Sequence, residues 1–365
     1  MGLNCGIIGL ANCGKTTFFN CMSSTKAEAT NYAFATNKSN IGVIKVPDPR
    51  LPELTKLQPT KKEVPATMEI VDVPGLTKGS SRGQGIGNAF LNDIKSSDAL
   101  IHVLRCFDDE NLPHVDDSVD PARDWETVNF ELQVKDMETV ERKIGRMEKL
   151  VKTGDKDAKK DMEILNLYKQ HLDALQPART APVSKEDARV IDDLFLYSAK
   201  PVMVVCNVDD EHASEDNEYV KQVREALKDE NIKILRIAAG IESEIAELDK
   251  EDERHEFLND YGLDQPSVDV LIREAYDMLN LQSFFTIGEE ENRAWTIRKG
   301  MTAPEAAGVI HSDLQKGFIR AEVMKYEDFV NYKSEQAVKE VGKFYVEGKN
   351  YVVQDGDILH IRFNI

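Results

Sequence analysis

The sequence has few cysteines, no long apolar run and a deficit of basic side chains. Its 365 residues include only five cysteines, without the paired spacing of a metal site, so we expect free thiols in a reducing compartment. The longest apolar runs, such as residues 202–206, are far below the ~20 residues of a membrane helix. The first residues, MGLNCGIIGLANCGKTT, lack the basic region and cleavage site of a secretory signal. These absences predict a cytoplasmic protein that makes no membrane contact.

Acidic residues outnumber basic ones by 65 to 46, which gives a formal net charge of −19. This balance argues against a protein that coats nucleic acid through its whole surface, and we expect no readout of DNA sequence. Apolar residues make up 41% of the chain, which is enough to build cores and excludes wholesale disorder.

Short β-branched runs alternate with helical stretches in two parts of the chain, and this alternation predicts an α/β fold with a parallel sheet. The expected strands are residues 4–10, 40–46, 68–73, 99–104, 202–206 and 232–237. We assign residues 1–130 and 197–281 to one nucleotide-binding domain of this kind.

Residues 131–196 have helical periodicity instead. Apolar side chains from Val134 to Val151 recur every three or four residues, and a second such stripe runs from Met162 to Leu175 after Gly154. We expect an inserted antiparallel helical hairpin.

Residues 282–365 predict a small α+β domain. Strand-like stretches at 294–297, 319–323, 351–353 and 359–363 alternate with turn signals, and one helix is expected over 303–314, after Thr302.

The segment from Gly9 to Thr16, GLANCGKT, matches G-x-x-x-x-G-K-[ST] and lies between an expected strand and an expected helix. This is the context of a phosphate-binding loop, in which a curled backbone directs N–H groups at the phosphates. Lys15 would contact the β- and γ-phosphates, and the Thr16 hydroxyl would bind Mg²⁺. The residues expected to hold the nucleotide here are Asn12, Cys13, Gly14, Lys15, Thr16 and Thr17.

A second element, DVPG, begins at Asp72 and ends at Gly75, directly after an expected strand. Asp72 would hold a water molecule on Mg²⁺, and the Gly75 N–H would meet the γ-phosphate. The alternative is an ordinary turn after a strand.

A third element, Asn207-Val208-Asp209-Asp210, has the form of the N-K-x-D motif with which GTPases read the base, but Val208 replaces the lysine. We predict that Asn207, Val208 and Asp210 border the base and that guanine recognition is weakened. An ordinary turn again remains open.

These motifs resemble those of the YchF / Obg-like ATPase family, within the Obg branch of P-loop NTPases, over nearly the whole chain. The resemblance rests on residues 9–16, 31–36 (NYAFAT), 72–76, 83–88 (GQGIGN) and 239–244 (AGIESE). It implies hydrolysis of ATP in preference to GTP, or of both, association with ribosomes, and a C-terminal TGS-type domain.

The resemblance also assigns individual roles. Thr36 matches the switch threonine that binds Mg²⁺ when the γ-phosphate is present. Leu76 stands where many GTPases carry a water-orienting glutamine, and His114 matches a family histidine proposed for that role, although it can also be an ordinary loop side chain. Asp210 stands where the family usually has glutamate, which favours GTP, while Val208 favours ATP.

Basic residues gather at the expected tip of the hairpin, between Arg142 and Lys160. They predict either a solvated helix face or a surface that contacts phosphates of ribosomal RNA. The TGS-like domain is the alternative candidate for the contact with ribosomal RNA. Three other functions are open. One is a GTP-preferring GTPase, which Asp210 favours, and another is a nucleotide-binding scaffold with negligible hydrolysis, which Leu76 favours. The third is a small-molecule kinase, which would need an arginine-rich lid.

Overall fold

The structure is a computed structural model that describes residues 4–23, 40–75, 87–248 and 250–364, without the side chains of residues 87–90. The chain forms two compact units. The first comprises Leu3–Gly42 with Ile70–Val268, and the second comprises Val43–Glu69 with Asp269–Ile365.

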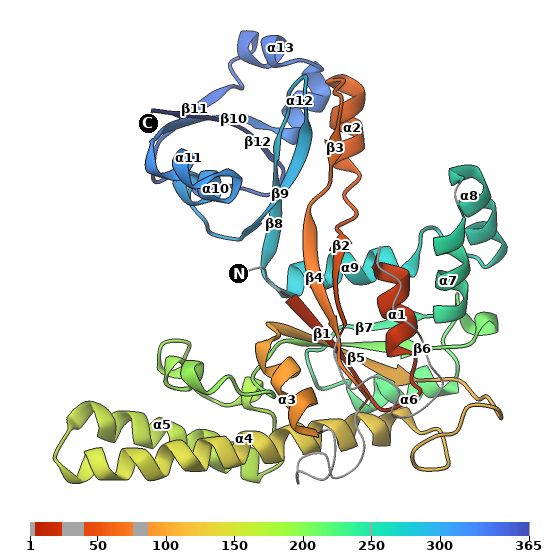
Figure 1. Ribbon diagram of the computed structural model, residues 1–365, viewed down its shortest axis with the longest axis vertical. Helices are drawn as coiled ribbons and strands as arrows, with labels where there is room; N and C mark the ends of the chain where they lie inside the picture. The colour runs from red at the N-terminus through yellow and green to blue at the C-terminus, as the bar shows by residue number, and fades with distance from the viewer. Residues whose placement is uncertain (1–3, 24–39, 76–86, 249, 365) are drawn as a thin grey trace. The chain divides into compact units, whose positions relative to one another are not determined.

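A six-stranded sheet of order β2-β4-β1-β5-β6-β7 organises the first unit (Figure 1). Its strands are β1 (Asn4–Ile8), β2 (Asn40–Lys45), β4 (Thr67–Asp72), β5 (Ala99–Arg105), β6 (Val202–Asn207) and β7 (Ile234–Ile237). The pairs β1–β5, β5–β6 and β6–β7 are parallel. Every residue of β5 is buried, as expected for a central strand covered on both faces. The predicted α/β fold with a parallel-type sheet is confirmed.

Helices cover both faces of this sheet. They include α1 (Lys15–Met22), α3 (Gly87–Ser96), α6 (Glu218–Ala226), α7 (Ala239–Glu247) and α8 (Glu251–Asp260). One apolar cluster joins Leu104, Val204 and Cys206 to α6 and α7, and a second joins Ile8, Val71 and Leu100 to α3 and the start of α4. By strand register both clusters lie on one face of the sheet, where they pack α3, the start of α4 and α6 against β1, β5 and β6.

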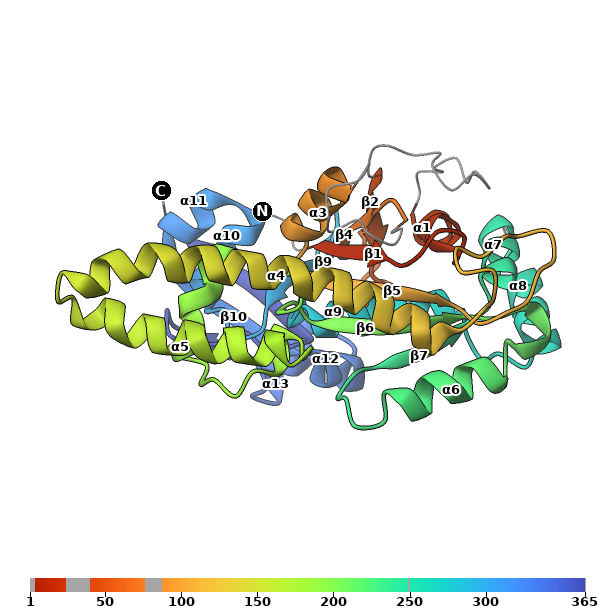
Figure 2. The same cartoon turned by 90° about the horizontal axis from the view of Figure 1, so that it is seen from below.

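A long helical hairpin projects from the first unit. It consists of α4 (Pro121–Lys152) and α5 (Lys156–Asp173), which lie side by side in both ribbon views (Figures 1 and 2). Asp120 caps α4, and Gly154, with φ +85°, lies in the turn before the Asp155 cap of α5. Val140, Leu165 and Leu172 form part of the apolar core between the two helices.

The hairpin differs from the expected insertion at both ends. Helix α4 begins at Pro121, ten residues before the expected start at 131, because Trp125, Val128 and Leu132 pack against the sheet clusters and continue the same helix. After α5 the chain forms only the 3₁₀ helices Ala178–Thr180 and Asp187–Leu194, rather than further α-helix.

Asp136 ties α4 to the segment that leads into β6. Its fully buried carboxylate accepts hydrogen bonds from the Tyr197 N–H (2.7 Å), the Ser198 N–H (2.6 Å) and the Ser198 hydroxyl (2.6 Å). Burial raises the pKa of Asp136 to about 6, so the group is still a carboxylate at pH 7.

The second unit contains a six-stranded sheet of order β11-β10-β12-β8-β9-β3. Its strands are β3 (Glu63–Val64), β8 (Leu281–Thr286), β9 (Asn292–Arg298), β10 (Phe318–Lys325), β11 (Tyr345–Glu347) and β12 (Asp357–Phe363). Its helices are α2 (Arg50–Leu57), α9 (Ser267–Met278), α10 (Ala303–Ile310), α11 (Ser312–Lys316), α12 (Tyr326–Tyr332) and α13 (Glu335–Glu340). Phe284, Ala307 and Leu359 lie in its core.

Two expectations for this unit were wrong. The helix expected over residues 303–314 ends at Ile310, because the backbone of His311 is extended (φ −163°), and α11 starts as a new helix. The strand expected over 351–353 is reduced to one antiparallel bridge between Thr302 and Val352.

Residues 43–69, which include the second half of β2 and the first half of β4, group with the second unit, whereas the sequence-based division placed them in the nucleotide-binding domain. They belong to the second unit because β3 pairs with β9, and because the buried Asn292 side chain donates to the Gln58 carbonyl (2.8 Å). These contacts join positions more than 200 residues apart, which periodicity does not reveal.

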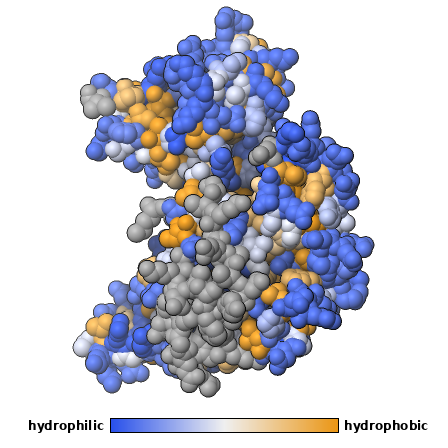
Figure 3. Space-filling view, turned by 45° about the vertical axis from the view of Figure 1, so that its right-hand side comes forward, coloured by the Kyte–Doolittle hydropathy of each residue, from blue (hydrophilic) through white to orange (hydrophobic). Residues whose placement is uncertain are grey.

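The described surface seen in Figure 3 is mostly hydrophilic, with small apolar patches. Among the described residues, no helix is both long and apolar enough to cross a membrane.

We expect the substitution Asp136→Asn to lower the free energy of unfolding by about 2 kcal/mol, because the amide NH₂ faces donors that the carboxylate now satisfies. Urea unfolding with an unchanged m-value measures this loss. The exposed Asp229→Asn is the matched control, and equal midpoints for the two variants would contradict the anchoring role of Asp136.

Candidate nucleotide-binding site

The loop between β1 and α1 has the curled backbone that phosphate binding requires. Gly9 (φ +150°), Asn12 (φ +63°) and Gly14 (φ +101°) all have positive φ. Backbone of this kind brings successive N–H groups toward one point, and the N-terminus of α1 follows at Lys15.

The two glycines of this loop lie too close to neighbouring groups to carry a side chain. A Cβ on Gly9 would lie 2.4 Å from the Val103 carbonyl oxygen, and one on Gly14 would lie 2.3 Å from Nδ2 of Asn207. The loop is therefore pressed against the ends of β5 and β6, and glycine is needed at both positions.

Lys15 lies along this loop and is nearly buried. Its Nζ donates to the Leu10 carbonyl (2.6 Å). Gly75 approaches from the end of β4, so that a Cβ there would lie 3.2 Å from Lys15 Nζ and 3.0 Å from Ala11 Cα. The structure thus brings together the two elements expected to contact the γ-phosphate.

Thr16 and Asp72 form a pair of oxygen ligands beside the loop. The Thr16 hydroxyl donates to the buried Asp72 carboxylate (2.9 Å). Burial raises the pKa of Asp72, and the charge of Lys15 opposes this rise. A hydroxyl and a carboxylate are the hard oxygen donors that Mg²⁺ prefers, so these residues fit the expected metal. In the described ranges no cluster of three or more histidine, cysteine, aspartate and glutamate side chains offers another metal site.

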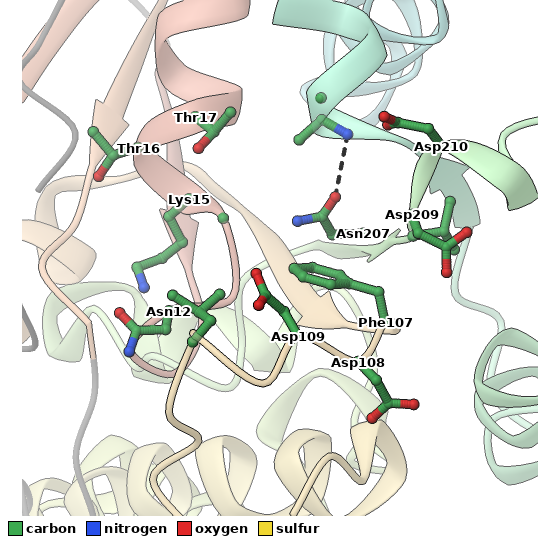
Figure 4. Close-up of a pocket in the computed structure, with 15 residues that line it drawn as sticks. Asn12, Lys15, Thr16, Thr17, Phe107, Asp108, Asp109, Asn207, Asp209 and Asp210 are labelled. Carbon is green, nitrogen blue, oxygen red and sulfur yellow. Dashed lines mark hydrogen bonds between the residues drawn. The ribbon is translucent and has the colours of Figure 1, made fainter. Parts of the chain in front are cut away.

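Asn207 braces the loop from the end of β6. Its Nδ2 donates to the Cys13 carbonyl (3.0 Å), and its Oδ1 accepts from the Ala239 N–H (3.2 Å), the bond drawn as a dashed line in Figure 4. Both polar groups of this buried side chain are therefore satisfied by protein, and Asn207 contributes by holding the phosphate loop to the start of α7.

Val208 and Asp210 border the same cavity in different ways. Val208 packs into the apolar cluster under α6 and α7, and its N–H donates to the Ile237 carbonyl (3.0 Å). Asp210 is exposed and lies so close to Gly240 that a Cβ there would be 2.7 Å from its Oδ1. An aliphatic side chain and one carboxylate thus lie where the motif comparison expects contact with the base.

The phosphate loop and the residues that follow β6 line one cavity of about 530 Å³ at the carboxyl ends of the strands, where ligands bind in open α/β sheets (Figure 4). Its lining residues are Asn12, Gly14, Lys15, Thr16, Thr17, Phe107, Asp108, Asp109, Leu112, Asn207, Val208, Asp209, Asp210, Ala239 and Gly240. Most of the predicted nucleotide-binding residues are among them. Cys13 is not: it is buried, and its carbonyl accepts the hydrogen bond from Asn207. Asp72 and Gly75 are also absent from this lining, and Asp72 is connected to it through the Thr16 hydroxyl.

One wall of the cavity was missed by sequence reasoning. It is the loop from Phe107 to Leu112, which follows β5 and is held by Arg105. The buried Arg105 guanidinium donates to the carbonyls of Phe107 (3.1 Å), Asp109 (3.2 Å) and Leu112 (2.8 Å). The sequence did hold one signal for this loop: it directly follows an expected parallel strand, where ligand-binding loops of open α/β sheets lie.

His114 does not line the cavity, although a hydrogen bond connects the neighbouring Pro113 to the phosphate loop. Its Nδ1 accepts from the Asp116 N–H (3.1 Å), so Nε2 carries the proton and donates to Asp124 (2.8 Å). Asn12 donates to the Pro113 carbonyl (3.0 Å) and so connects this segment to the loop. The proposed role of His114 stays a prediction.

Other predicted features lie outside the described residues. They are Thr36 with the rest of 31–36, Leu76, and the glycine-rich segment up to residue 86; the side chain of Asn88 is also outside the description.

The comparisons with known proteins agree with this geometry. A family described as "50S ribosome-binding GTPase" matches residues 4–152, and the YchF-GTPase_C model, described as a protein of unknown function, matches residues 281–364. The "Ribosome-binding ATPase YchF" of Bacillus subtilis is 46% identical over 100% of both chains. The chain belongs to the YchF family. The protein of the same name from Escherichia coli O157:H7 is 45% identical, also over 100% of both chains.

Structural similarity extends over both units of this YchF chain. The solved structure of the Schizosaccharomyces pombe YchF GTPase matches with a TM-score of 0.88 and 34% identity, covering 99% of this chain and 98% of that one.

We expect Asn207→Ala to weaken the binding of ADP by about tenfold, because the two hydrogen bonds that join the phosphate loop to the start of α7 are lost. Isothermal titration calorimetry measures the affinity. Asn259→Ala, on the exposed side of α8, is the control. Wild-type affinity in the Asn207 variant would show that the loop keeps its shape without the brace.

Proposed function

We propose that this chain is a Mg²⁺-dependent nucleoside triphosphatase that hydrolyses ATP in preference to GTP and associates with ribosomes in the cytoplasm. The observation that carries the proposal is the convergence on one cavity of the curled loop, Lys15 and Thr16, whose hydroxyl donates to Asp72. The names of the full-length relatives, "Ribosome-binding ATPase YchF", support both the reaction and the partner.

Each site residue then has a role in phosphoryl transfer to water. The loop amides from Asn12 to Thr17 hold the phosphates, and Lys15 neutralises charge that develops on them in the transition state. The Gly75 N–H meets the γ-phosphate. Thr16, Thr36 and, through water, Asp72 would hold Mg²⁺, which when bound neutralises phosphate charge.

The attacking water needs an orienting group, and we propose His114 for this step. Leu76 has no polar atom with which to bind water, so it does not replace the glutamine of other GTPases. The His114 ring is paired with Asp124 at 2.8 Å, and it must exchange this partner to reach the cavity. Hydrolysis by the purified protein is therefore expected to be slow.

We expect Lys15→Ala to abolish hydrolysis and to weaken ATP binding strongly, because no other described lysine or arginine lines the cavity. Phosphate release with purified protein measures the rate. Lys228→Ala, an exposed lysine of the same unit, is the control. Unchanged hydrolysis in the Lys15 variant would refute the assignment of the active site.

The preference for ATP is proposed from Val208 and from the relatives' names. Val208 is buried and aliphatic, so the lysine that braces guanine-binding sites is missing, whereas Asp210 still offers a carboxylate to a guanine. We expect tighter binding of ATP than of GTP, and a further loss of GTP binding in Asp210→Glu. Calorimetric titrations with ATP, ADP, GTP and GDP measure both, and tight GTP binding without ATP binding would reverse the assignment.

A second candidate is a nucleotide-dependent scaffold with negligible hydrolysis, which Leu76 and the paired state of His114 favour. Single-turnover hydrolysis with and without ribosomes separates the two functions. For the ribosomal contact we propose ribosomal RNA, bound through the basic hairpin or through the C-terminal TGS-like domain.

A further inference from the structure

The basic residues at the hairpin tip fall into two groups that differ in their partners. Lys143 pairs with Asp193 (2.5 Å) and Lys160 with Asp187 (2.7 Å), so the cations that face the 3₁₀ segment are neutralised. Four others on α4 are exposed and have no carboxylate partner in the described part of the chain: Arg142, Arg146, Lys149 and Lys152. The guanidinium of Arg142 donates only to the Glu138 carbonyl and the Thr139 hydroxyl.

These four residues form one ridge, which we call the α4 ridge. Their spacing of three or four residues places them on one side of the helix over about 15 Å. Val140, Ile144 and Met147 recur with the same spacing on the opposite side and pack into the hairpin core. The one acidic residue between its first and last members is Glu148, which lies about 100° around the helix from Lys149 and about 40° from Lys152, and no ion pair joins Glu148 to either lysine.

Gly145 lies within the α4 ridge and has no structural reason to be glycine. It is exposed in the last third of a 32-residue helix, seven residues before the final one, and a Cβ there would have no atom within 4 Å. Glycine weakens a helix interior relative to alanine, so helix formation favours another residue here, and packing does not exclude one. What glycine does provide is an uncovered stretch of backbone between cations, against which a partner can approach closely.

We infer that the α4 ridge is the contact surface for the phosphate backbone of ribosomal RNA, with Gly145 at the point of closest approach. This inference rests on the proposed ribosome association and selects the hairpin over the C-terminal unit. In a chain of net charge −19, unpaired cations along one helix face complement a polyanion. A membrane surface is a poorer partner, because the apolar side of α4 is already buried against α5.

The test uses the full-length chain with Arg142, Arg146 and Lys149 all changed to glutamine. The matched control changes Lys185, Lys221 and Lys228, which are exposed elsewhere in the same unit, to glutamine. We expect the ridge variant to bind a ribosomal RNA duplex about tenfold more weakly, and its plot of log affinity against log salt to lose about 2–3 units of slope. The control is expected to bind like the wild type.

Cosedimentation with purified 70S ribosomes is expected to fall in the same variant, while its ATP hydrolysis without ribosomes stays at the wild-type level. Equal RNA affinity in the ridge and control variants would overturn the proposal, as would equally tight binding of polyglutamate or of phosphatidylserine vesicles. A wild-type chain that hydrolyses ATP but never sediments with ribosomes would instead refute the proposed ribosome association.

Gly145→Leu tests the close approach without changing charge. Leucine favours the helix, so this variant is expected to fold and to melt at or above the wild-type temperature. We expect its RNA affinity to fall several-fold. Wild-type affinity would show that the backbone at Gly145 is not in contact with RNA.

Discussion

The contact between the Asn207 amide and the Cys13 carbonyl is the constraint on which the site depends. A backbone with positive φ at Gly9, Asn12 and Gly14 is costly to maintain for an isolated chain, and it persists only where its surroundings hold it. Asn207 supplies this support from β6, and its second bond reaches α7. One buried side chain therefore connects the phosphate loop to the segment that borders the other end of the cavity.

The parallel order of β1, β5 and β6 explains why residues far apart in the sequence meet there. Parallel strands end at the same edge of the sheet, so the loops that follow them surround one cavity. The same arrangement lets α4 start beside the sheet, where Trp125 is buried, and extend into the hairpin as one continuous helix. The sheet beside the site and the hairpin are thus joined by one continuous helix.

Much of the fold and of the site was predictable because local rules decide it. The glycine spacing from Gly9 to Gly14 and the strand–loop–helix context identify the phosphate loop, and the stripe from Val134 to Val151 identifies α4. The wall held by Arg105 was not predictable in the same way, because its hydrogen bonds are made to backbone carbonyls and leave no motif. Residues 43–69 were placed in the other unit for a similar reason, since β3 is defined by its pairing with a distant strand.

The amino-acid sequence alone determined the family, the α/β class and the chemical types present at the site, because each depends on residue identity and short-range spacing. Only the tertiary structure decided which groups remain available for binding. Asn207 makes two hydrogen bonds within the protein, His114 is paired with Asp124, and Lys143 is paired with Asp193. Arg146 and Lys149, in contrast, have no carboxylate partner among the residues that the structure describes. Such pairing joins side chains from separate elements, and it follows from their packing in space rather than from their order along the chain.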